Sequence, residues 1–268
     1  MDPEQRKKLS DAYFGILSSF TLGFLRVFRS KLTFETLSVA LTLLHDPDTQ
    51  LPEAEPPTEA LRLLLQIPYA HYDAFAYVTI ISHLVYATTL LDTFLSDTTK
   101  FLLLLYPAAV GKDHQVPFST ILEAEDRTKI IETAASKRTR ELGYLSFPAR
   151  VGFLKRAFGL PIQLSPGAEA ALEHYPTIRN IMIHDQGIFA LSLGPDGTPQ
   201  LEQKTCPLHP TPLDANEVQR AADAYCRIVI ALCKAIVSQV FKEETLPQYE
   251  RAFAALLPAR LGLSQTEP

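Results

Sequence analysis

Hydrophobic residues recur with a helical period over most of the chain. Between residues 4 and 30 they lie three and four positions apart and form one apolar stripe, made of Leu9, Tyr13, Ile16, Leu17, Phe20, Phe24 and Phe28. A second short helix is expected at Phe34–Leu44. Residues 71–105 carry the strongest helical pattern, which Pro107 ends. The pattern therefore predicts an all-α protein.

Capping residues, prolines and glycines divide the rest of the chain into further helices. They predict helices at residues 118–141, 147–158, 166–174, 176–185 and 214–244. Between the last two, residues 188–205 alternate in polarity on either side of the turn Gly194–Gly197. This alternation predicts one accessory β-hairpin.

An acidic, proline-rich stretch separates two parts of the chain. Residues 46–59 contain five acidic residues, four prolines and no basic residue, a composition typical of an exposed loop. We therefore expect an N-terminal helical extension with this loop at residues 1–69. A helical domain at residues 70–268 follows, with the hairpin at about residues 188–205.

Composition narrows the class of protein. The chain has 268 residues, 47% of them hydrophobic, and a formal net charge of −5, which excludes a disordered chain and argues against a general polyanion binder. Its three cysteines are too few for a disulfide scaffold. Two of them, Cys226 and Cys233, share one helix face and are interpreted as core residues. The motifs of serine hydrolases and zinc proteases, Gly-x-Ser-x-Gly and His-Glu-x-x-His, do not occur.

Two apolar segments resemble membrane elements but are interpreted as helices of a soluble, cytoplasmic protein. Arg26 and Arg29 directly follow the first, residues 12–25, without a small-residue cleavage site. The second, residues 74–91, contains several hydroxyl side chains and barely reaches the length of a membrane span. No membrane partner is expected.

The stretch from Arg179 to Gly187 carries the most informative chemistry. On a helix, Arg179, Asn180 and His184 lie at about 0°, 100° and 140°. The opposite side is apolar, with Ile178, Ile181 and Met182. An imidazole transfers protons near neutral pH and a guanidinium can neutralise a phosphorane, so the three residues suit phosphodiester cleavage by a 2′-hydroxyl. The alternative is a surface arginine with a histidine that the helix dipole stabilises.

The pattern Arg-Asn-x-x-x-His-x-x-Gly resembles the signature of ribonucleases of the HEPN (higher eukaryotes and prokaryotes nucleotide-binding) family. Two further blocks are similar to the first core helix and the middle segment of a prokaryotic branch of that family. The first comprises Leu90–Asp97 and Phe101–Pro107, and the second comprises Leu145–Leu154 and Phe158–Leu160. The blocks follow the family's order, and the resemblance covers about residues 70–240.

This resemblance implies a HEPN-like helical bundle that forms a homodimer with its motif helices facing each other. It also implies a metal-independent endoribonuclease that uses no cofactor and leaves a 2′,3′-cyclic phosphate. Arg179 would contact the scissile phosphate, His184 would act as general base or acid, and Asn180 would orient the pair or bind RNA. By family analogy the protein would be a toxin or antiphage defence effector, and an antitoxin or regulatory protein is a candidate partner.

Basic residues concentrate just before the motif. Residues 127–156 contain eight Lys and Arg against two Glu, a local charge of +6. We expect this basic strip to hold the RNA backbone through Arg138, Arg140, Lys155 and Arg156. The alternative is a solvated helix face. The nearby aromatic residues are interpreted as core residues rather than as stacking partners for bases: Tyr144, Phe147, Phe153 and Phe158.

Two other interpretations accompany this hypothesis. A catalytically silent HEPN module that binds a protein or RNA is the alternative function, although an inert copy has no chemical need for both Arg179 and His184. Metal binding is not expected, because the other histidines lack convincing ligand partners. Asp92 and Asp97 are candidates for orienting Arg179, or they cap and solvate their own helix.

Overall fold

The computed structural model describes residues 2–45, 72–111, 121, 126–184, 189–193, 199–203, 215–242 and 247–256. Side chains are described at residues 2–27, 82–111, 121, 126–180, 217–242 and 247–256. The fold is all-α, as the hydrophobic pattern predicts.

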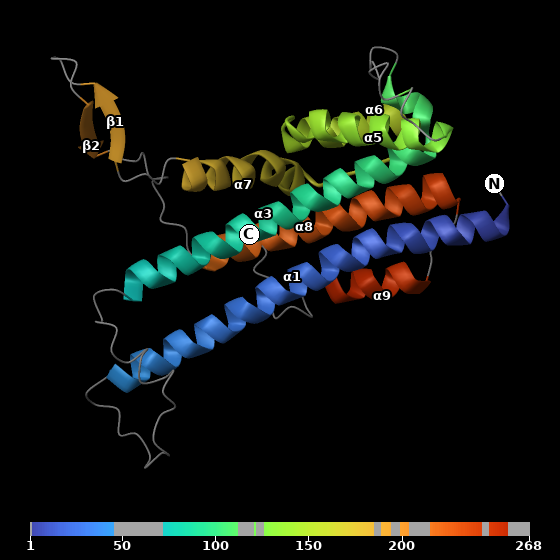
Figure 1. The fold of residues 1–268 in the computed structure, drawn as a ribbon. Helices are drawn as coiled ribbons and strands as arrows, with labels where there is room; N and C mark the ends of the chain where they lie inside the picture. Colours follow the sequence, from blue (N-terminus) through green and yellow to red (C-terminus); the bar gives the residue numbers. More distant parts are fainter. Residues whose placement is uncertain are drawn as a thin grey trace.

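The described helices and strands follow one another along the chain in a simple order (Figure 1). They are α1 (Pro3–His45), α3 (Tyr72–Leu105), the 3-10 helix η2 (Pro107–Val110), α5 (Arg127–Gly143), α6 (Phe147–Phe158), α7 (Pro166–His184), β1 (Phe189–Leu193), β2 (Pro199–Gln203), α8 (Ala215–Ile236), the π-helix η3 (Val237–Phe241) and α9 (Pro247–Leu256). The two strands pair antiparallel, with Leu191 opposite Leu201.

Helix α3 lies at the centre of the bundle (Figure 1). It packs against α1 and α8 along its length, and α9 covers α1. Helices α5, α6 and α7 all contact α3, and α7 also packs on α8. The predicted motif helix is therefore fixed between two core helices.

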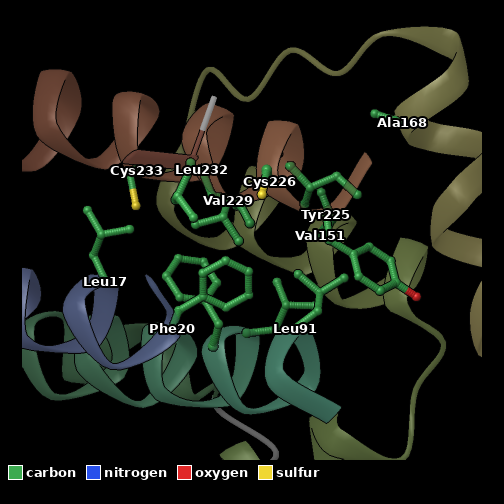
Figure 2. Close-up of a cluster of buried hydrophobic side chains, with 14 of the residues drawn as sticks. Leu17, Phe20, Leu91, Val151, Ala168, Tyr225, Cys226, Val229, Leu232 and Cys233 are labelled. Atoms are coloured by element: carbon green, nitrogen blue, oxygen red, sulfur yellow. The ribbon is translucent and has the colours of Figure 1, made fainter. Parts of the chain in front are cut away.

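One hydrophobic core joins the N-terminal helix to the rest of the bundle. Tyr13, Leu17, Phe20 and Phe24 of α1 are buried, as the predicted stripe requires, and they pack in one cluster with side chains of α3 and α8. Figure 2 shows Leu17 and Phe20 opposite the α8 side chains, and Leu91 of α3 beside them. In the described residues α1 thus belongs to the same core as α3.

The two cysteines predicted to share a core face do so. Cys226 and Cys233 lie on α8 and are 1% and 0% exposed. Burial raises the pKa of both thiols, that of Cys233 to about 12, because a thiolate is poorly solvated there. The Tyr13 hydroxyl lies 3.6 Å from the Cys233 sulfur. Both cysteines are structural.

Two pairs of predicted helices prove to be single helices. Residues 4–30 and 34–44 are parts of the 43-residue helix α1. No proline or glycine lies between the two segments, and extending a helix is easier than starting a new one. The predicted helices at 166–174 and 176–185 are both parts of α7, with Pro176 inside it. Apolar packing before and after Pro176, at Leu172 and Ile178, keeps the helix continuous.

Two other helices show which sequence signals determine where a helix begins and ends. Helix α6 begins after Ser146 and ends at Gly159, whose φ of 63° lies in the left-handed region that glycine favours. Helix α5 begins only at Arg127, because the Asp126 side chain caps it by accepting from the Lys129 amide at 2.9 Å. Part of the predicted 118–126 segment and Asp214 lie outside the described residues.

The C-terminal helices differ from the prediction of one helix to residue 244. Helix α8 changes into the π-helix η3 at Val237, and Lys242 ends it with a left-handed φ of 54°. Helix α9, which the pattern did not predict, then packs on α1 through Tyr249, whose hydroxyl donates to the Ser10 carbonyl at 2.8 Å. By length and composition, Glu217–Phe241 could cross a membrane, but 61% of its apolar window is buried inside the protein.

Candidate functional site

The motif residues lie in the last two turns of α7. Ile178 is buried in the core, whereas Arg179 is half-buried and Asn180 is exposed. The helix therefore presents the guanidinium and the amide away from its apolar side, as the spacing predicts. Arg179 Nη1 donates to Asn180 Oδ1 at 2.9 Å, so Asn180 orients the guanidinium.

His184 is the last residue of α7. Its backbone lies four residues beyond Asn180, which places the two positions on the same side of the helix, about 40° apart. The side chain of His184 lies outside the described residues, as do those of Ile181 and Met182. The backbone thus brings the three predicted catalytic positions to one end of one helix.

Arg179 and Asn180 line a cavity of about 650 Å³. Its walls come from α3 with Asp92, from the end of α5 and the start of α6 with Tyr144 between them, and from α7 with Glu173. A cavity of this size can accommodate a nucleotide. The candidate site is therefore a pocket that the motif helix shares with α3 and the α5–α6 connection.

A tyrosine–glutamate contact fixes the motif helix on α8. The Tyr175 hydroxyl donates to Glu217 Oε2 at 3.2 Å, and burial followed by the nearby carboxylate raises the pKa of Tyr175. Arg220 Nη2 donates to the other oxygen of Glu217 at 2.7 Å. Glu217 of α8 therefore holds the turn of α7 that precedes Arg179.

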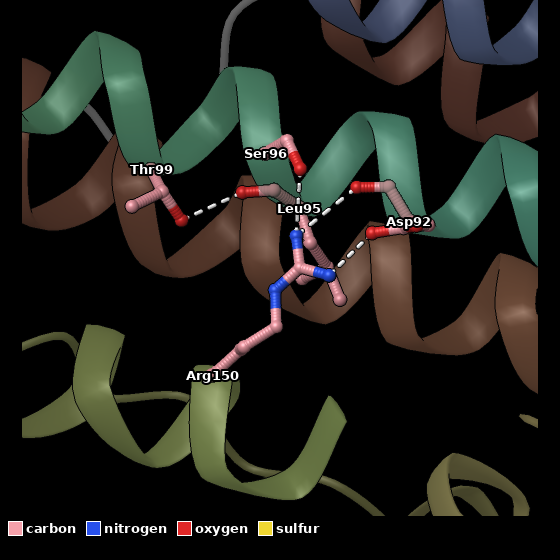
Figure 3. A network of polar contacts seen from close by, with 5 residues as sticks. All are labelled: Asp92, Leu95, Ser96, Thr99 and Arg150. Atoms are coloured by element: carbon pink, nitrogen blue, oxygen red, sulfur yellow. Dashed lines mark hydrogen bonds and ion pairs between the residues drawn. The ribbon is translucent and has the colours of Figure 1, made fainter. Parts of the chain in front are cut away.

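Arg150 is a buried structural arginine, although it belongs to the predicted basic strip. It is 2% exposed, and it forms an ion pair with Asp92 of α3. Its Nη2 donates to the Asp92 carbonyl at 3.1 Å and to Ser96 Oγ at 2.8 Å (Figure 3). The guanidinium also lies 5.5 Å from the centre of the Phe147 ring. Arg150 therefore joins α6 to α3 and contributes no charge to an RNA-binding face.

This network also bears on the two aspartates considered as partners of Arg179. Asp92 lines the same cavity as Arg179, but the arginine that it binds is Arg150. Asp97 is exposed, and partial burial raises its pKa while the Lys100 charge lowers it. Among the described side chains Arg179 forms no ion pair, so its charge is not neutralised there.

The four residues predicted to bind RNA differ in their surroundings. Arg140 and Arg156 are exposed and Lys155 is half-buried. Arg138 is half-buried, donates to Glu141 at 3.2 Å and lies 5.6 Å from the centre of the Phe153 ring. Of these four residues, Arg140 and Arg156 are thus the most accessible to a polyanion.

The prediction for the nearby aromatic residues is correct for three and wrong for one. Phe147, Phe153 and Phe158 pack against the core. Tyr144, in contrast, is 85% exposed and lines the cavity beside Arg179. It follows the end of α5, where the chain turns towards α6.

The spacing of the apolar residues in α6 indicates that Arg150 is buried. Arg150 precedes Leu154 by one helical turn and is adjacent to Val151, and both are buried. It therefore lies on the apolar face of α6. A basic residue on such a face is usually paired. No comparable signal identified Tyr144 or Glu173 as cavity residues.

In the part of the chain that the structure describes, no three His, Cys, Asp or Glu side chains come close enough to hold a metal ion. Comparison of the chain with protein-family models, with curated proteins and with solved structures finds no match.

Proposed function

We propose that the protein is a metal-independent endoribonuclease with a HEPN-like helical bundle, an accessory hairpin and an N-terminal helical extension. The observation that carries this proposal is the Arg179–Asn180 pair at the cavity: a guanidinium oriented by an amide and without a carboxylate partner among the described side chains. Such a guanidinium is suited to bind a phosphate by two parallel hydrogen bonds.

The proposed reaction is attack of a ribose 2′-hydroxyl on the adjacent phosphate. His184 takes the 2′-hydroxyl proton, the new O2′–P bond forms, and the P–O5′ bond breaks. The leaving 5′-oxygen takes a proton, and the other product ends in a 2′,3′-cyclic phosphate. Arg179 stabilises the charge that develops on the phosphorane.

One chain supplies one His184, whereas the reaction uses a general base and a general acid. We therefore propose a homodimer in which His184 of a second copy protonates the leaving oxygen. The cellular role follows from the resemblance: a cytoplasmic toxin or antiphage effector restrained by an antitoxin or regulatory protein.

Cleavage of RNA by the purified chain in EDTA tests this proposal. We expect cleavage to persist, and His184→Ala and Arg179→Ala to reduce its rate by about 100-fold or more each, since proton transfer and charge stabilisation each contribute that much. A 2′-deoxyribose at the cut site should block the reaction. His174→Ala on α7 and Arg227→Ala on α8, which do not line the cavity, are the matched controls.

Two results would contradict the proposal. One is strict dependence on magnesium or manganese. The other is full retention of cleavage in His184→Ala. RNA that is bound but never cut by the wild-type chain would instead support the silent module. Sedimentation of the active preparation as a monomer would overturn the shared arrangement of the two histidines.

A further inference from the structure

An exposed tyrosine lines the cavity. Tyr144 is 85% exposed, and the neighbouring Leu145 is 45% exposed. Both line the cavity together with Arg179 and Asn180. A tyrosine ring left in water beside a phosphate-binding guanidinium is well placed to stack on a nucleobase, because every base offers an apolar π-face.

The same cavity contains a carboxylate that no described side chain pairs, that of Glu173. Glu173 is exposed, lines the cavity and forms no ion pair with any described side chain. Asp92, the other acidic residue of the wall, is bound to Arg150. The two carboxylates are balanced by Arg150 behind the wall and Arg179 in it, so the pocket does not repel RNA.

The positions of Glu173 and Arg179 match the dimensions of one nucleotide. They are separated by six residues of α7, which is about 9 Å along the helix axis. A nucleotide places its phosphate and the far edge of its base at comparable separation. One nucleotide can therefore contact Arg179 with its phosphate and Glu173 with its base.

A carboxylate distinguishes among the four RNA bases by counting adjacent donors. Guanine presents N1–H and N2–H side by side, which match the two oxygens of a carboxylate. Adenine and cytosine present one amino group beside an acceptor nitrogen, and uracil presents one N–H between two carbonyl oxygens. The carboxylate of Glu173, which no described side chain pairs, thus favours guanine.

We propose that this cavity is the base-recognition subsite of the enzyme and binds a guanine adjacent to the scissile phosphate. Tyr144 stacks on the base, and Glu173 accepts hydrogen bonds from its N1–H and N2–H groups. This assignment rests on the proposed function, because the guanine is placed relative to a phosphate held by Arg179.

Binding of uncleavable RNA to the full chain tests the assignment. The probes are short labelled oligouridylates with 2′-O-methyl riboses, in which one central base is guanine, adenine, cytosine or uracil. Fluorescence anisotropy should give a Kd about ten-fold lower for the guanine probe than for the others. Tyr144→Ala should raise the Kd for the guanine probe about ten-fold or more by removing the stacking.

Glu173→Gln should abolish the preference for guanine, because an amide cannot accept both donors. Its control is Glu169→Gln, which removes the same charge one turn earlier on α7 and outside the cavity lining. The control for Tyr144→Ala is Tyr86→Ala, a second exposed tyrosine that does not line the cavity. Both controls should keep the wild-type ratio of Kd values.

Three outcomes would overturn the assignment. They are equal affinity of the wild type for all four probes, an unchanged Kd in Tyr144→Ala, and loss of the guanine preference in Glu169→Gln as large as in Glu173→Gln. Because the probes cannot be cut, the test is separate from the test of catalysis. Cleavage without base preference removes the subsite alone, whereas guanine preference without cleavage removes the ribonuclease and leaves a guanine-binding pocket.

Discussion

Two arginines on neighbouring helices have opposite surroundings. Arg150 of α6 is 2% exposed and bound to a carboxylate, a carbonyl and a hydroxyl of α3. Arg179 of α7 is half-buried, and its partner among the described side chains is the neutral amide of Asn180. The first guanidinium is paired with a carboxylate within the protein, whereas the second has no carboxylate partner among the described side chains.

The difference shows that the partner of an arginine distinguishes a stabilising role from an expected chemical role. Removing one member of a buried ion pair leaves an uncompensated charge, which is strongly destabilising. Removing a half-buried arginine whose partner among the described side chains is an exposed amide leaves little unsatisfied. The same residue type is therefore expected to contribute stability in α6 and chemistry in α7.

Replacement of each arginine by alanine should give the largest contrast. Arg150→Ala should lower the free energy of unfolding by about 2–4 kcal/mol, because it removes the ion pair and the packing on Phe147. Arg179→Ala should lower it by less than about 1 kcal/mol. Urea unfolding followed by circular dichroism measures both. Equal losses in the two variants would contradict the comparison.

Replacement of each arginine by lysine should give a smaller difference in the free energy of unfolding, again with the larger loss at Arg150. In Arg150→Lys the ammonium keeps the charge but cannot reach the Asp92 carboxylate, the Asp92 carbonyl and Ser96 with the fork geometry of a guanidinium. We expect a loss of about 1–2 kcal/mol in the free energy of unfolding. Arg179→Lys should leave it within about 0.5 kcal/mol. An Arg150→Lys variant as stable as the wild type would show that charge alone suffices at this position.

The smallest effects are expected along the basic strip. Arg138 of α5 is bound to Glu141, whereas Arg140 of α5 and Arg156 of α6 form no ion pair with a described side chain. Arg140→Gln and Arg156→Gln should each flatten the log–log salt dependence of RNA binding by roughly 0.7–0.9. Arg138→Gln should change this slope less, since Arg138 is bound to Glu141. Anisotropy titrations at several salt concentrations give the slopes. Unchanged slopes in Arg140→Gln and Arg156→Gln would show that RNA does not follow this face.

The sequence predicted the parts of the fold that depend on local spacing. The three- and four-residue spacing of Tyr13, Leu17, Phe20 and Phe24 identified the buried face of α1, because a helix places these positions on one side. Local sequence signals did not predict the features of the helices that depend on tertiary packing. They divided α7 at Pro176, and they did not predict the π-helix η3, which inserts a wider turn before Lys242.

The candidate site was predictable to the same extent. The positions of Arg179 and Asn180 relative to Ile178 follow from helix geometry, and the structure has them as expected. The role of Arg150 depends on its contact with Asp92, which lies 58 residues away in the chain, so local spacing indicates its burial but not its partner. The exposure of Tyr144 depends on what covers the corner after α5, which no local pattern reports.

Pro176 has a mechanical consequence for the motif. A proline has no amide hydrogen, so the Leu172 carbonyl lacks its usual partner four residues later, and both residues line the cavity. One backbone hydrogen bond is therefore missing between the two halves of α7. The turn before Pro176 is held on α8 through Tyr175 and Glu217. Arg179 and Asn180 lie after the position of the missing hydrogen bond. A small tilt at this joint moves the guanidinium and the amide as one unit and leaves the anchored half of the helix in place.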